Sequence, residues 1–260
     1  MTGPEDLGLR FLIAGNWKMN GSRAMLAELD RIAEAAAASP NVDVAIAPPF
    51  TLLSDAEPRA GSVWIGGQDC HQAVKGAHTG SISADMLAEF GARFVICGHS
   101  ERRAEYGERD SLIQAKAQAA QAAGLTAIVC VGEDEPERDD GRAVPVVADE
   151  LDGSVPPASR ADNLVISYEP AWAIGTGRTP TLAEICEMHA MIRAKLIQML
   201  GEEGARVRIL YGGSVNPANA AQILACEDVN GALIGGASLT AETFAPIIRA
   251  ASKLGANVSQ

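Results

Sequence analysis

The amino-acid sequence predicts an α/β fold, a single (β/α)8 barrel, and three observations carry that prediction. Its 260 residues match the roughly 250 that such a barrel needs. Eight short apolar runs follow one another along the chain, and segments with helical periodicity separate them. No linker divides these units into two halves. Residues 1–260 are therefore expected to form one domain, with 1–9 as an N-terminal extension and 255–260 as a loosely ordered tail.

The eight runs are continuously apolar, as parallel strands buried on both faces should be. They cover residues 11–14, 44–47, 63–65, 94–97, 127–131, 164–168, 207–211 and 232–234. An open doubly wound sheet is the competing fold. It would normally carry a G-x-G-x-x-G turn after its first strand, and here that turn reads Gly15-Asn16-Trp17-Lys18.

The intervening segments carry apolar residues at helical spacing. The clearest stripes are Leu26, Leu29, Ile32, Ala33 and Ala36, then Ile185, Met188, Ile192 and Leu196, and last Phe244, Ile247, Ile248, Ala251 and Leu254. Pro40 ends the first stripe, and a capping box of Thr181 and Glu184 opens the second, which stops near Gly201. Asn216-Pro217 predicts another helix start. Residues 138–153, with many charges and Pro145, predict a broken helix.

Composition excludes several classes of protein. No apolar run approaches the roughly 18 residues of a membrane span. The net charge of −12 argues against a nucleic-acid or anionic-membrane partner. The five cysteines are scattered without a C-x-x-C pair, which indicates reduced thiols rather than a disulfide or zinc framework. The N-terminus lacks the features of a signal peptide, so a cytoplasmic location is expected.

The ends of the predicted strands carry the residues of interest, because a (β/α)8 barrel builds its active site there. Glu169 ends the sixth strand and is followed by Pro170 and an apolar, glycine-containing segment up to Gly177. Alone, Glu169 would more simply cap a neighbouring helix. A carboxylate followed by a hinged apolar flap instead suits a base that acts on substrate while water is excluded.

Lys18 and His99 follow the first and fourth strands. Alone, a strand-end lysine would be a solvated charge and a strand-end histidine a structural residue. Beside Asn16 in an acidic protein, Lys18 is a natural countercharge for an anionic ligand. His99 comes just before a short polar segment that Ser100 could cap as a helix, and a helix N-terminus favours the neutral imidazole. We interpret the arginines that follow, Arg102 and Arg103, as a solvated or interface ion network.

Two Gly-Gly turns follow the seventh and eighth strands, at Gly212-Gly213-Ser214 and Gly235-Gly236. Glycines let backbone N–H groups approach an anion, and phosphate sites of such barrels occupy these two loops. The predicted site thus contains a base, a neutral histidine, a lysine and a phosphate cradle, and the sequence carries neither a metal cluster nor a nucleotide motif. This combination predicts cofactor-free proton transfer beside a carbonyl in a small phosphorylated substrate.

Over essentially the whole chain these motifs resemble the triosephosphate isomerase family. The segments that carry the resemblance are residues 14–20, 97–103, 168–170, 172–177, 211–215 and 235–239. The resemblance implies interconversion of dihydroxyacetone phosphate and glyceraldehyde 3-phosphate through an enediol(ate). Glu169 would shuttle the proton, His99 would polarise the carbonyl oxygens, and Asn16 and Lys18 would stabilise the oxyanion.

The resemblance also implies ligand and partner contacts. Gly175, Ser214, Gly235 and Gly236 would hold the phosphate by main-chain N–H groups, with no metal or cofactor. The family is typically a homodimer in which the loop after the third strand, here around Thr79, reaches into the partner's active site. The chain departs from the family pattern at Asp69, His78, Ser81, Ala171, Arg178 and Asn230. The Ser81 change puts in doubt one interface ion pair, to the arginine that matches Arg102.

Three alternatives stay open. An isomerase of the same build could act on a four-carbon ketose phosphate. A Schiff-base aldolase barrel could use Lys18, although the sixth strand ends in Glu169 where such an enzyme often has its lysine. A non-catalytic binding protein could merely keep the fold, against which the complete set of Asn16, Lys18, His99 and Glu169 argues.

Overall fold

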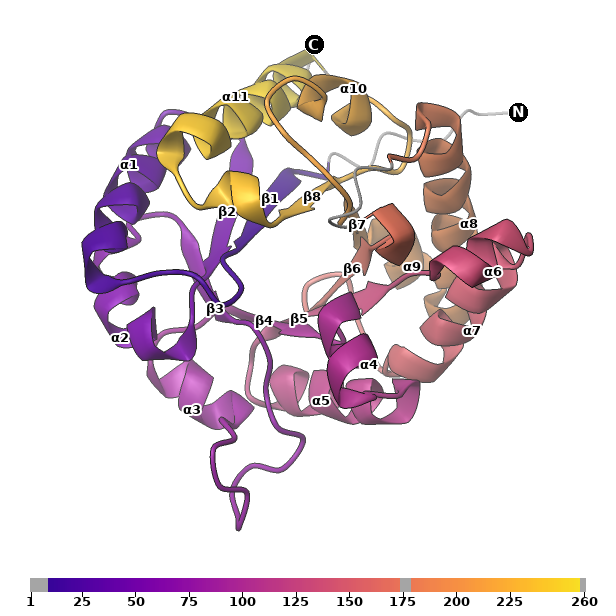
Figure 1. The fold of residues 1–260 in the computed structure, drawn as a ribbon, viewed down its shortest axis with the longest axis horizontal. Coiled ribbons are helices and arrows are strands. Elements are labelled where there is room, and N and C mark those ends of the chain that lie inside the picture. The colour runs from indigo at the N-terminus through magenta and orange to yellow at the C-terminus, as the bar shows by residue number, and fades with distance from the viewer. Residues whose placement is uncertain (1–8, 174–178, 258–260) are drawn as a thin grey trace.

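The computed structural model describes residues 9–173 and 179–257, which form a closed parallel barrel with its strands in chain order (Figure 1). The strands are β1 Phe11–Asn16, β2 Val42–Ala47, β3 Trp64–Gly67, β4 Phe94–Cys97, β5 Thr126–Val131, β6 Leu164–Tyr168, β7 Arg208–Tyr211 and β8 Gly231–Ile234. Closure comes from pairing of β1 with β8, where Leu12 lies opposite Gly231. Each of the eight predicted runs is therefore a strand, and the predicted fold class is confirmed.

The helices surround the barrel (Figure 1). They are α1 Leu26–Ala37, α2 Leu53–Ala56, α3 Ala84–Glu89, α4 Ser100–Tyr106, α5 Asp110–Ala122, α6 Glu135–Asp139, α7 Ala143–Ser154, α8 Leu182–Leu200, α9 Glu202–Arg206, α10 Ala220–Leu224 and α11 Ala241–Asn257. Short 3-10 turns are η1 Arg23–Met25, η2 Phe50–Leu52, η3 Glu57–Arg59, η4 Ala171–Ala173 and η5 Gly236–Ser238. No helix within the described ranges is long and apolar enough to cross a membrane.

Local sequence signals set several helix ends. The predicted capping box opens α8, because the Thr181 side chain accepts from the Glu184 N–H while the Glu184 carboxylate accepts from the Thr181 N–H. The broken helix predicted in residues 138–153 is confirmed as α6 and α7, and Pro145 lies in the first turn of α7, where its missing N–H costs little.

The regular helix α10 begins at Ala220, three residues after the start predicted at Pro217. The Asn216 side chain accepts from the Ala218 N–H at 2.9 Å, and the Asn216 N–H donates to the Asn219 side chain at 2.8 Å. These reciprocal bonds are those of a helix cap, and the Asn216 carbonyl also accepts from the Ala220 N–H at 3.0 Å, so Asn216 caps this segment as predicted, with an irregular turn before α10.

The core has two layers. One fills the barrel interior, with Leu12, Ala14, Phe94, Ile96 and Val165 among its members. The other lies between strands and helices and includes the alternate residues of the same strands, such as Ile13, Val95 and Ile166. Because successive side chains of a strand point to opposite faces, both faces are apolar, which explains the continuous apolar runs in the sequence.

Candidate active site

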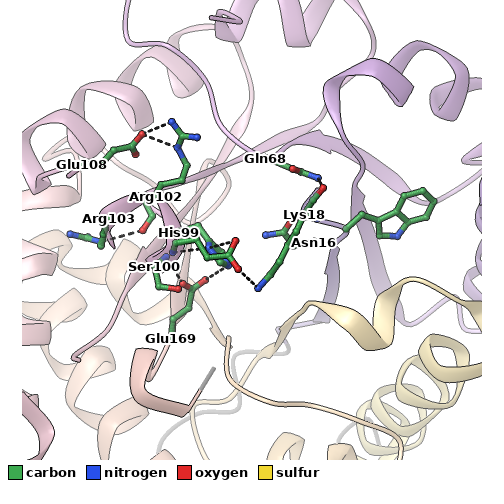
Figure 2. Close-up of polar contacts among 12 residues, drawn as sticks. Asn16, Lys18, Gln68, His99, Ser100, Arg102, Arg103, Glu108 and Glu169 are labelled. Atoms are coloured by element: carbon green, nitrogen blue, oxygen red, sulfur yellow. Dashed lines mark hydrogen bonds and ion pairs between the residues drawn. The ribbon is translucent and has the colours of Figure 1, made fainter. Parts of the chain in front are cut away.

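Glu169 follows β6 and is buried at the carboxyl end of the barrel, with 1% of its surface exposed. Its Oε2 accepts a hydrogen bond of 2.9 Å from the backbone N–H of Ser100, at the start of α4. Its Oε1 is buried without a hydrogen-bond partner in the described chain and lies 3.6 Å from Nε2 of His99 (Figure 2). Gly212 lies against the same side chain, since a Cβ there would come within 2.6 Å of Glu169 Cγ. One carboxylate oxygen is therefore fixed by a hydrogen bond, and the other is available to accept a proton.

His99 is itself the N-cap of α4, and the prediction that Ser100 caps this helix is wrong. Nδ1 of His99 accepts from the Glu101 N–H at 3.2 Å, so Ser100 occupies the first helical position and offers its N–H to Glu169 instead. An acceptor at Nδ1 carries a lone pair, which leaves the ring proton of the neutral imidazole on Nε2. The proton-bearing nitrogen thus faces the carboxylate.

Asn16 ends β1, and Lys18 lies two residues further on, after Trp17. The Lys18 backbone has a left-handed φ of 54°, a strained conformation for a residue with a side chain. Two amides brace it: Asn16 Oδ1 accepts from the Lys18 N–H at 2.9 Å, and Gln68 Nε2 donates to the Lys18 carbonyl at 2.8 Å (Figure 2). Gln68 also donates to the Ala47 carbonyl. It was missed from the sequence, where its place just after the third strand was the available signal.

The Lys18 ammonium forms an ion pair of 2.8 Å with Glu101, in the first turn of α4. Burial alone would raise the pKa of Glu101, but the hydrogen bond from Lys18 and the positive charge of Lys18 act against it, and that pKa is lowered. Glu101 therefore stays ionised and holds the lysine beside the imidazole, because Nδ1 of His99 is 3.6 Å from its second oxygen.

The predicted phosphate cradle lies beside this lysine. A Cβ on Gly235 would be 3.4 Å from Lys18 Cε, whereas one on Gly236 would meet nothing within 4 Å. The indole N–H of Trp17 donates to the Ser238 carbonyl at 3.0 Å and ties the end of β1 to the loop after β8. Ser214 is exposed at the other Gly-Gly turn. Gly175 lies outside the described residues.

Glu133 anchors the described part of the flap, and it was not singled out from the sequence. Its buried Oε1 accepts from the Trp172 indole at 2.8 Å and from the Tyr168 hydroxyl at 3.1 Å. Its carbonyl accepts from the Ala171 N–H at 3.0 Å. Burial and the Glu133 charge raise the pKa of Tyr168, so the phenol keeps the proton that it donates. The turn η4 is thereby fixed to the loop after β5.

The arginines after His99 form ion networks inside this chain. Arg102 pairs with Asp69 at 3.0 Å and Glu108 at 2.7 Å. Arg103, with 17% of its side chain exposed, pairs with Asp110 and Glu150 and also donates to two backbone carbonyls. The solvated or interface network expected for Arg103 is therefore wrong, because β4, β5 and α7 enclose its guanidinium.

The chain was compared with known proteins. The family model described as triosephosphate isomerase matches residues 11–251. A triosephosphate isomerase of Afipia carboxidovorans is 57% identical over 245 residues, covering 93% of this chain and 98% of that protein. One from a Ruegeria species is 54% identical over 241 residues with the same coverage.

Among solved structures, a crystal structure of triosephosphate isomerase from Bartonella henselae superposes with a TM-score of 0.88 at 47% identity. It covers 93% of this chain and 99% of that one. Sequence and fold agree over nearly the full length of each protein. The chain belongs to the triosephosphate isomerase family.

Proposed function

We propose that this protein interconverts dihydroxyacetone phosphate and glyceraldehyde 3-phosphate by moving one proton between adjacent carbons. The observation that carries the proposal is the pairing of Glu169 Oε1, buried without a hydrogen-bond partner in the described chain, with the imidazole Nε2 at 3.6 Å. A base and a neutral donor that face one small volume are what enolisation beside a carbonyl requires. Family membership supports the choice of a triose phosphate as substrate.

Glu169 is the proposed base. In this arrangement its carboxylate accepts a hydrogen bond from the Ser100 N–H. When substrate binds, the carboxylate would give up this hydrogen bond and remove the proton from the substrate carbon. The same carboxyl group then returns the proton to the neighbouring carbon. Because Glu169 is almost fully buried, its basicity acts in a site from which water is largely excluded.

His99, Lys18 and Asn16 are the proposed oxyanion stabilisers. The Nε2–H of His99 would donate to the carbonyl oxygen as negative charge develops there, and the hydroxyl proton that must pass from one substrate oxygen to the other would move through this imidazole. The Lys18 ammonium lies where charge develops, held by Glu101 at 2.8 Å. Asn16 holds the Lys18 backbone, and its amide nitrogen is the donor we assign to the substrate.

Four groups are the proposed phosphate ligands: Gly235, Gly236, Ser214 and, beyond the described residues, Gly175. The open space at Gly236 and the closeness of Gly235 to Lys18 support a dianion bound there between backbone N–H groups and one ammonium. Binding would use the main-chain N–H groups of these residues, which the absence of a side chain at Gly235 and Gly236 leaves accessible to a bulky anion.

Glu169→Gln tests the base, because the amide oxygen still accepts from the Ser100 N–H while basicity is lost. We expect kcat to fall by about 10²–10⁴-fold, the range for general-base removal. Binding of inorganic phosphate, measured by calorimetry, should change little. Glu105→Gln, an exposed carboxylate on α4, is the matched control. Wild-type turnover by the Glu169 variant would refute the assignment, and faster turnover of a four-carbon ketose phosphate than of the triose would refute the substrate.

A homodimer is the second part of the proposal. The loop after β3 projects from the barrel (Figure 1), and residues 74–81, including Thr79, are exposed. Beside its base lies a cavity of about 350 Å³, whose lining includes Phe50, Gly80, Ser81 and Arg102. Met19 is 96% exposed and Val74 60%. Apolar side chains around a projecting loop and a cavity suit docking of a second copy.

Sedimentation of the wild type and of Thr79→Arg tests this association. The wild type should sediment as a dimer at micromolar concentration, and the variant should dissociate and lose activity. A fully active wild-type monomer would refute the proposal. A cytoplasmic location is also proposed, and it is supported by the free thiols of all five cysteines.

A further inference from the structure

The guanidinium of Arg103 makes no ion pair or hydrogen bond with the side chains of His99 or Glu169 in the described chain, whereas the Arg103 backbone N–H donates to the His99 carbonyl at 3.1 Å. The Nε of Arg103 donates to the carbonyl of Gly98 at 3.2 Å, and its Nη2 donates to the carbonyl of Cys130 at 3.0 Å. Gly98 immediately precedes His99, and Cys130 lies near the end of β5. One guanidinium therefore ties the carboxyl ends of β4 and β5 together, at the residue that precedes His99.

Two acids compete for this guanidinium. Nη1 of Arg103 lies 2.6 Å from Asp110 of α5 and 3.1 Å from Glu150 of α7. Ser154 completes the cluster, since its hydroxyl accepts from Arg103 at 3.2 Å and donates to Asp110 at 3.0 Å. A single cation thus serves two carboxylates in a largely buried position.

Glu150 reaches the catalytic strand through a glycine. Its Oε2 accepts from the Gly132 N–H at 2.7 Å. Gly132 packs directly on the main chain of Glu169, because a Cβ at Gly132 would come within 1.8 Å of the Glu169 carbonyl oxygen. The backbone N–H of Glu169 in turn donates to the Val131 carbonyl at 2.8 Å. A shift of Gly132 must therefore move the backbone that carries the base.

We propose that Arg103 and Glu150 are positioning residues, which hold the ends of β4 and β5 so that His99 and Glu169 keep the geometry needed for proton transfer. This inference rests on the proposed isomerase activity. Neither residue touches the reacting atoms. Each acts through backbone contacts, at Gly98 and Cys130 for Arg103 and at Gly132 for Glu150.

The pair also makes catalysis sensitive to pH near neutrality. Burial raises the pKa of Glu150 to about 7, against the lowering effect of Arg103 and of the Gly132 N–H. The facing charges of Asp110 on α5 and Glu137 on α6 raise that pKa further. From α8, Lys195 is paired with Asp152 at 2.6 Å. Above neutral pH the carboxylate holds Gly132 with a charge-assisted bond, which a protonated acid does not provide.

The test is the dependence of kcat and KM on pH from 5.5 to 9 for the wild type, Glu150→Gln and Asp152→Asn. Asp152 is the matched control, because it lies on the same helix and pairs with a cation, but at the exposed outer face. The ionisation of the substrate phosphate near pH 6 is common to all three proteins, so differences between them belong to the protein.

We expect the wild-type kcat to rise about three- to tenfold through pH 7, a rise that Asp152→Asn keeps and Glu150→Gln lacks. Asp110→Asn should move the midpoint to lower pH, because it removes a negative charge beside Glu150. Arg103→Lys, which loses the planar fork, should lower kcat about tenfold and leave KM nearly unchanged.

The amide resonance of Gly132 gives a readout without turnover. It should titrate near pH 7 in the wild type and not in Glu150→Gln. An active wild type whose kcat profile is the same as that of Glu150→Gln, or a Gly132 amide that titrates equally in both, would overturn the positioning role alone. A wild type without isomerase activity at any pH would overturn the proposed function and this role together.

Discussion

The carboxylate of Glu169 accepts a hydrogen bond of 2.9 Å from the backbone N–H of Ser100, across the site from its own strand. That N–H belongs to the first turn of α4, whose N-cap is His99. One helix terminus therefore fixes both proposed proton-transfer partners. The base rests on the helix N–H, and the imidazole is oriented by accepting from the next one, that of Glu101.

His99→Asn separates capping from catalysis. Asparagine is a strong N-cap and its oxygen can replace Nδ1 as acceptor for the Glu101 N–H, so the fold should be retained. Its shorter side chain presents no donor at the position of Nε2. We expect kcat to fall about 10²–10³-fold, as for loss of one oxyanion donor, with little change in melting temperature. Unchanged kcat would show that the imidazole is only a cap.

Lys18→Gly and Lys18→Ala separate charge from backbone strain. Both remove the ammonium next to Gly235, and kcat/KM should fall roughly 10- to 100-fold in each, since a charge-assisted hydrogen bond contributes about 1.5–3 kcal/mol. The glycine variant relieves the φ of 54°, and after the entropy cost of glycine it should be about 0.5 kcal/mol more stable in urea than the alanine variant. An inverted order of stability would contradict the strain assigned to Lys18.

Trp172→Phe tests the anchoring of the flap by Glu133. The change removes the indole N–H that donates to the buried carboxylate at 2.8 Å. Loss of this bond should destabilise the protein by about 1–3 kcal/mol and loosen η4. An enediolate exposed to water would lose its phosphate, so inorganic phosphate released per isomerisation should rise. A variant with the wild-type ratio of phosphate to product would show that this bond does not govern water exclusion.

Glu150→Gln should also change the dependence of stability on pH. The folded-state pKa of about 7 lies above the ordinary value of 4.5, so the folded protein binds more protons than the unfolded chain between these pH values. The contribution of Glu150 to stability is therefore complete below pH 4.5 and is lost as pH rises through 7. That loss is roughly 3 kcal/mol at most.

Removal of the ionisable group should remove that loss. The melting temperature of Glu150→Gln, relative to wild type, should be higher at pH 8 than at pH 5, as measured by scanning calorimetry in buffers of matched ionic strength. Asp152→Asn serves again as the control. A constant difference between the two proteins across this pH range would contradict the ionisation assigned to Glu150.

The barrel, and the rim on which the site lies, follow from the pattern of apolar residues in the amino-acid sequence. Each strand is apolar on both faces, so the runs were visible without coordinates, and parallel strands in a closed barrel place their carboxyl ends on one rim. Asn16 is the last residue of its strand, and Lys18, His99 and Glu169 each lie within two residues of a strand end. Their meeting at that rim therefore follows from chain order alone.

The groups that hold these residues in place come from segments far apart in the sequence, and their roles follow from contacts that exist only in the folded protein. Ser100 N–H meets Glu169 across 69 positions of sequence, and Gln68 braces Lys18 across 50. Glu133 and Glu150 belong to no recognisable sequence motif. In the sequence a glutamate that will be buried looks the same as one on the surface, because burial depends on how the chain packs. The cap of α4 was misassigned to Ser100 because an imidazole accepts from a backbone N–H only when the path of the loop aims Nδ1 at it. Hydrogen-bond direction and desolvation depend on the closed barrel, whereas apolar periodicity is local to each strand.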